Sequence, residues 1–193
     1  LDYLVYETLA ERTIALANIE RAKDPELGYN ELLEDRLIAA LPHCKAHGTR
    51  VVTSMGAANP LAAQRKTLEL IGRLGLCAIK VAAVIGDDVL DYCLANAQSL
   101  RVMETGIPLS ELKGEIVSAN AYLGADNIVA ALDQGADIVI TGRVADCSLF
   151  LAPMIHEFGW SQEDWETLGK GQIAADMVEC GANVSGGFFA DPG

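Results

Sequence analysis

Charged, amide and hydroxyl side chains stand at the ends of apolar segments in this chain. The clearest case is Arg143 and Asp146, which follow the apolar run Asp137–Thr141. The planar fork of Arg143 suits the binding of an anionic substrate such as a carboxylate or phosphate. Asp146 can accept a bond from a substrate hydroxyl or act as a catalytic base. Alternatively, Asp146 caps the following helix and pairs with Arg143, in which case both residues are structural.

Two adjacent carboxylates and one amide follow other apolar segments. Asp87 and Asp88 come after the run 77–85, and Asn59 follows the turn that begins at Gly56. Neighbouring carboxylates suit acid–base catalysis by Asp87 or a divalent metal ligand at Asp88. Capping of the next helix is the interpretation that the sequence favours for both aspartates. Asn59 either orients a substrate carbonyl or simply forms the turn before Pro60.

Three more polar residues complete the candidate site. Glu7 and Arg12 lie in the segment after the first apolar run, five positions apart, so they do not align on one helix face. We therefore expect one of them to face a cleft. Asn120 closes the segment 115–121, and we expect it to bind substrate with Asn59.

Other catalytic patterns are weak. Cys147 stands near a helix start, which lowers a thiol pKa, but no histidine is close in sequence, so a buried thiol is the favoured interpretation. His43, His47 and His156 show no metal-binding spacing. The chain contains neither GxGxxG nor GxxxxGK[ST], and its sequence therefore indicates no particular cofactor. Gly186-Gly187 predicts only a turn.

The apolar segments alternate with helical patterns. This alternation predicts a layered, Rossmann-like α/β fold, with a mostly parallel sheet flanked by helices; a truncated barrel is the less favoured alternative. A helix is predicted over 31–41, ending at Pro42. In a parallel sheet the carboxyl ends of all strands meet at one edge, where ligands bind. Strands are predicted at 3–6, 50–55, 77–85, 115–121 and 137–141.

Composition restricts the class of protein. The length of 193 residues favours one domain, and the start at Leu1 predicts an internal piece of a longer protein. A formal net charge of −13 argues against nucleic-acid binding and against an anionic membrane surface. Five scattered cysteines without CxxC spacing are typical of a reducing compartment, and no signal peptide is evident, so we expect a cytoplasmic protein.

Several segments together resemble a known family. They are YLVYETLAERTIALA, TSMGAANPLA, AVIGDD, SANAYLGADNIVAALDQGADIVITGRVADCSLFLAP, HEFGW and ECGANVSGGFF. In this order they resemble the N-terminal domain of the acyclic terpene utilisation (AtuA-like) proteins. The resemblance implies a missing N-terminal glycine-rich strand and loop and a missing C-terminal part. It also implies a departure, because Ala175-Asp176 stands where the family is expected to have Gly-His.

The resemblance implies a role in the breakdown of acyclic terpenes, whose intermediates are carried as CoA thioesters. The first hypothesis is a catabolic domain that performs a hydratase or lyase step on an anionic or acyl-CoA-linked intermediate. The second is a non-catalytic subunit or scaffold of a degradation complex. A homo-oligomer is compatible with both hypotheses.

Overall fold

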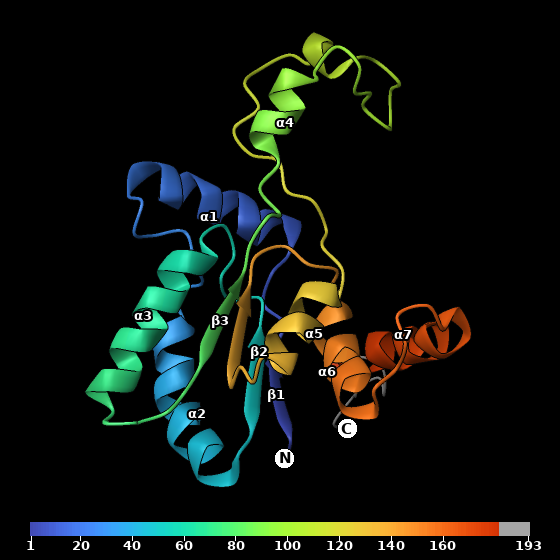
Figure 1. Cartoon of the computed structure of the whole chain (residues 1–193). Helices are drawn as coiled ribbons and strands as arrows, with labels where there is room; N and C mark the ends of the chain where they lie inside the picture. The colour runs from blue at the N-terminus through green and yellow to red at the C-terminus, as the bar shows by residue number, and fades with distance from the viewer. Residues whose placement is uncertain (182–193) are drawn as a thin grey trace, which may run out of the picture.

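The computed structural model describes residues 1–181, so the turn predicted at Gly186-Gly187 lies outside it. Four short parallel strands form its centre, in the order β1-β2-β4-β3 (Figure 1). The predicted α/β class is confirmed. The strands are β1 (Tyr3–Tyr6), β2 (Arg50–Thr53), β3 (Val81–Val84) and β4 (Ile138–Thr141).

Helices cover both faces of the sheet (Figure 1). Side chains alternate along each strand, so Val51 and Ile138 face one layer while Val52 and Val139 face the other. The first layer is α2 (Leu33–His47) and α3 (Pro60–Arg73). The second is α5 (Asp126–Asp133), α6 (Ser148–Phe158) and α7 (Trp165–Glu179).

The predicted end of a helix at Pro42 is wrong. Helix α2 continues through Pro42 to His47. Proline interrupts one backbone hydrogen bond, at a cost of about 3 kcal/mol. The buried stripe of Leu37, Leu41 and Cys44 continues across it, and burial of these side chains against the sheet offsets that cost.

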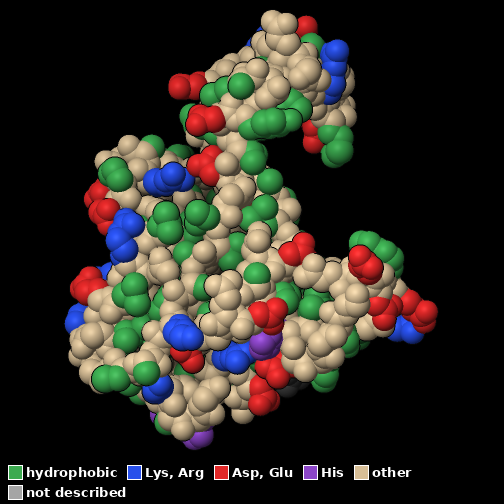
Figure 2. Space-filling view, viewed as in Figure 1, with side chains coloured by type: hydrophobic (Ala, Val, Ile, Leu, Met, Phe, Trp, Pro, Cys, Tyr) green, Lys and Arg blue, Asp and Glu red, His purple; other side chains and the backbone are tan. Residues whose placement is uncertain are grey.

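The predicted strand over 115–121 is also wrong. Within the described chain, its only sheet-like pairing is an isolated antiparallel bridge between Asn120 and Asp88. Residues 89–119, called the arm below, project beyond the carboxyl ends of the strands and carry α4 (Leu90–Ala95) and a short 3₁₀ helix at Leu109–Glu111 (Figure 1). Figure 2 shows the arm standing away from the body above a recess. Because no strand lies beside it there, the apolar segment has no ladder to join.

The backbone of the turn after β2 packs very closely against the end of β4. A Cβ atom at Gly56 would lie 2.5 Å from the carbonyl oxygen of Thr141 and 2.9 Å from Cα of Pro60. Both neighbours are backbone atoms, which cannot rotate away. Only glycine therefore lets the turn after β2 pass the end of β4.

The substitution Gly56→Ala should lower the free energy of unfolding by about 1–3 kcal/mol, because the added methyl must push two backbone segments apart. Urea unfolding followed by circular dichroism measures this. Gly72→Ala in α3 is the matched control, since its Cβ would meet nothing within 4 Å and alanine favours the helix. Equal stability of the two variants would contradict the proposed packing.

Candidate active site

Helix α1 (Glu11–Lys23) lies across the carboxyl edge of the sheet (Figure 1). Its buried residues Ile14 and Ala17 pack with Leu9, Ala57 and Ala58, which belong to the turns after β1 and β2. The helix therefore covers part of the edge at which the predicted site residues meet.

Asp87 links the ends of β3 and β4. The residue is 4% exposed, and its Oδ2 accepts hydrogen bonds from the backbone N–H of Arg143 at 2.9 Å and from Nδ2 of Asn120 at 3.0 Å. A Cβ at Gly142 would lie 2.6 Å from Asp87 Oδ1, so the carboxylate packs directly on this glycine. The predicted residues Asp87, Asn120 and Arg143 are thus brought together, but Asp87 is occupied by internal bonds.

The guanidinium of Arg143 is buried under the ring of Tyr122. Its Nη1 donates to the carbonyl of Leu9 at 2.8 Å, and Nε and Nη2 donate to the carbonyl of Val144 at 2.9 and 2.7 Å. Nη2 also donates to the carboxylate of Asp146, and the guanidinium carbon lies 4.5 Å from the centre of the Tyr122 ring. Most of its donors are used inside the protein, so this geometry favours a positioning role over direct binding of an anion.

Asn59 and Asp88 are engaged in local structure. Asn59 caps α3 through Oδ1 and donates through Nδ2 to the carbonyls of Pro25 and Leu27, so its amide is used by protein partners. Asp88 pairs with Arg21 at 3.1 Å and accepts from the N–H of Leu90.

Metal binding by Asp88 gains no support. Residues 1–181 contain no group of three His, Cys, Asp or Glu side chains that could hold a metal ion. Arg12 is exposed in the first turn of α1, and its role as a substrate contact stays a prediction.

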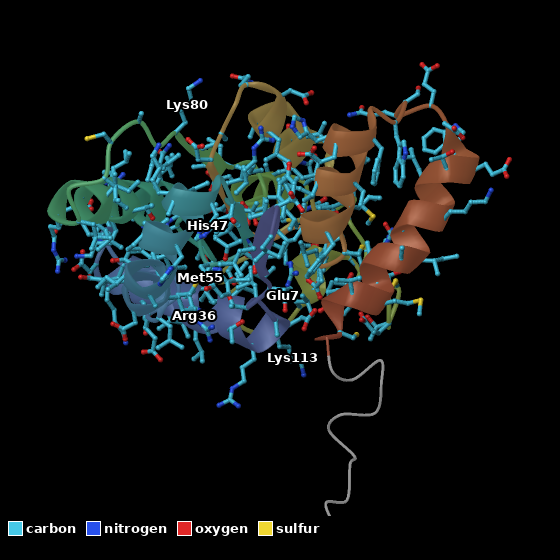
Figure 3. All side chains as sticks on the ribbon, turned by 90° about the horizontal axis from the view of Figure 1, so that it is seen from below. Glu7, Arg36, His47, Met55, Lys80 and Lys113 are labelled. Carbon is cyan, nitrogen blue, oxygen red and sulfur yellow. The ribbon has the colours of Figure 1, made fainter. Side chains whose placement is uncertain are left out.

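Glu7 is a predicted site residue with a partly buried carboxyl group and a raised pKa. It is partly buried at the end of β1, and Oε1 accepts from the backbone N–H of Leu9 at 2.7 Å. Burial raises the pKa of Glu7 above its ordinary value of 4.5, and the negative charges of Asp146 and Glu179 add to this rise. The hydrogen bond from Leu9 and the positive charge of Arg143 lower the pKa and offset the rise only in part. Figure 3 shows Glu7 between the strands and α7.

Sequence reasoning missed three residues near this point. The hydroxyl of Tyr122 donates to the carboxylate of Glu11, and this bond raises the pKa of Tyr122. Glu179, at the end of α7, lies close enough to influence Glu7. Tyr122 lies two positions after the predicted site residue Asn120, so its place near the site could be inferred from the sequence. No sequence pattern indicates that α7 returns to the end of β1.

Cys147 is buried beside Gln172, whose amide donates to the sulfur. Burial raises the pKa of the Cys147 thiol. A raised pKa keeps the sulfur protonated at neutral pH, so the geometry supports the interpretation of Cys147 as a buried thiol and not as a nucleophile.

The family model for "Acyclic terpene utilisation family protein AtuA" matches residues 1–193. The chain belongs to this family. Its membership connects the chain with the utilisation of acyclic terpenes. No curated protein and no solved structure matches the sequence. In the described part of this family member, no helix has both the length and the apolar character required to cross a membrane.

The substitution Glu7→Gln should stabilise this AtuA family member increasingly as the pH rises. A carboxyl group whose pKa is raised by folding contributes stability that is present below 4.5 and is lost as the pH rises through the folded-state pKa. The advantage of glutamine in the free energy of unfolding should therefore grow between pH 4 and pH 7. Urea unfolding at each pH measures this, with the exposed Glu163→Gln as control. A difference independent of pH would contradict the raised pKa.

Proposed function

We propose that this chain performs acid–base catalysis on the carbonyl end of an acyclic terpenoid intermediate, such as its acyl-CoA thioester. The observation that carries the proposal is the half-buried Glu7, whose raised pKa is caused by burial and by its carboxylate neighbour Asp146. Two carboxyl groups in different environments can divide the roles of acid and base between them. Membership in the acyclic terpene utilisation family supports the choice of substrate class.

The two carboxyl groups take different roles in this proposal. Asp146 is partly exposed and paired with Arg143, which remains charged at all physiological pH values. It acts as the base. Glu7, in the more buried position, acts as the acid. In a hydration of a carbon–carbon double bond conjugated with the carbonyl, Asp146 removes a proton from water as the water oxygen bonds to the β-carbon, and Glu7 delivers a proton to the α-carbon as the double bond is lost.

The charges at this edge favour a neutral reacting group. Glu7, Asp146 and Glu179 are carboxyl groups near one another, and most donors of the Arg143 guanidinium are used by protein acceptors. A free carboxylate placed there would be repelled, whereas a thioester or aldehyde carbonyl carries no charge. We therefore propose that the group of the substrate that reacts is a neutral carbonyl and not an anion.

A scaffold role is the second candidate, and the arm is the observation that favours it. In the arm, the residues Tyr92, Leu94 and Met103 are 62%, 51% and 90% exposed. Exposed apolar residues on a projecting segment suit contact with another subunit. Co-purification with a degradation enzyme through the arm, without turnover of any terpenoid thioester, would favour this candidate.

In the full-length protein, Glu7→Gln and Asp146→Asn should each reduce kcat by about 10²–10⁴-fold, because each removes one proton-transfer group. Turnover of acyclic terpenoid CoA thioesters and solvent deuterium incorporation into them are the measurements. Glu163→Gln, at an exposed position, should leave both unchanged. Wild-type rates in both Glu7→Gln and Asp146→Asn would overturn the acid–base proposal.

A further inference from the structure

A groove lies between the start of α5, helix α6 and the first half of α7. Its volume is about 610 Å³, within the range of sites that bind small organic ligands. Leu151 and Ile155 of α6 are buried in its wall, and Leu168 of α7 faces them. Trp165 stands at the groove with 78% of its surface exposed.

One end of the groove is polar. Cys147 and Gln172, which are hydrogen-bonded to each other, both line it, and Cys147 directly follows Asp146 in the chain. From Trp165 to Gln172 helix α7 rises about 10 Å, which matches the length of a short aliphatic chain. The apolar walls thus lead from an exposed tryptophan to Ala145 and Cys147, the chain neighbours of Asp146.

Two glycines of α7 shape this groove differently. A Cβ at Gly171 would lie 2.5 Å from the ring of Trp160 and 3.0 Å from Leu151, so this glycine allows α7 to pack closely on its neighbours. A Cβ at Gly169 would meet nothing within 4 Å, although Gly169 lines the groove. The space in front of Gly169 is therefore open and is not needed for packing of the helix.

We infer that this groove binds the branched aliphatic chain of the substrate, with the polar end of the molecule directed at Asp146. The inference rests on the proposed function for the identity of the substrate, and it adds the place where the apolar chain lies. Such a chain loses contact with water on entering the groove, which stabilises the complex by about 25 cal/mol for each Å² of apolar surface buried. The acidic residues at the edge select a neutral head group over a carboxylate.

Binding of citronellol, a neutral acyclic terpenoid alcohol, to the full-length protein tests the inference. Calorimetric titration should give at least a tenfold weaker affinity for Gly169→Leu than for wild type, because the leucine side chain fills the groove. Gly169→Ala, which adds only a methyl group to open space, should bind as wild type does. Both substitutions favour the helix, so circular dichroism should show α7 intact in each.

The outcomes separate the groove from the catalytic proposal. Glu7→Gln should still bind citronellol, because Glu7 is not part of the groove. Equal affinity of Gly169→Leu and Gly169→Ala, or no binding by the wild type, would overturn the groove as the chain-binding site while leaving the Glu7 kinetics untouched. Full turnover by Glu7→Gln, together with lost binding by Gly169→Leu, would reject the catalytic roles and retain the groove.

Discussion

The buried guanidinium of Arg143 is the interaction on which the carboxyl edge of this sheet depends. Its backbone N–H donates to Asp87 in the turn after β3, and its side chain donates to the carbonyl of Leu9 in the turn after β1. The backbone N–H of Leu9 in turn donates to Glu7. One residue at the end of β4 thus joins turns that lie on both sides of it in the sheet. Because a buried charge is costly unless its donors are satisfied, these positions are fixed together.

Much of the fold could be predicted from local sequence. Runs of β-branched residues such as Ile138–Thr141, bounded by glycine, identify buried strands without knowledge of their neighbours. The two errors depend on non-local packing. Helix α2 passes Pro42 because the sheet buries the residues on either side of the proline. The segment 115–121 forms no strand because most of it lies in the arm, and Asn120 returns to the sheet edge only through an isolated bridge to Asp88.

The candidate site was predictable in place but not in detail. A parallel sheet brings the ends of its strands to one edge, and Asp87, Asn120 and Arg143 do meet there. Residue type alone could not tell which side chains bond internally and which remain available. The polar groups of Asp87 and Arg143 bond mainly to other protein groups. The pKa of Glu7, in contrast, is raised by burial and by carboxylates that include Glu179. Helix α7 brings Glu179 to this position from 172 residues further along the chain.

The proposed acid role of Glu7 depends on its raised pKa, which is caused by burial and by neighbouring carboxylates such as Asp146. Carbon-13 NMR titration of the Glu7 carboxyl group, in wild type and in folded Asp146→Asn, tests this most directly. We predict a pKa above 4.5 in the wild type and a lower pKa in Asp146→Asn, because the substitution removes a negative charge that raises it. A wild-type pKa of 4.5, or a raised pKa that Asp146→Asn leaves unchanged, would contradict this role.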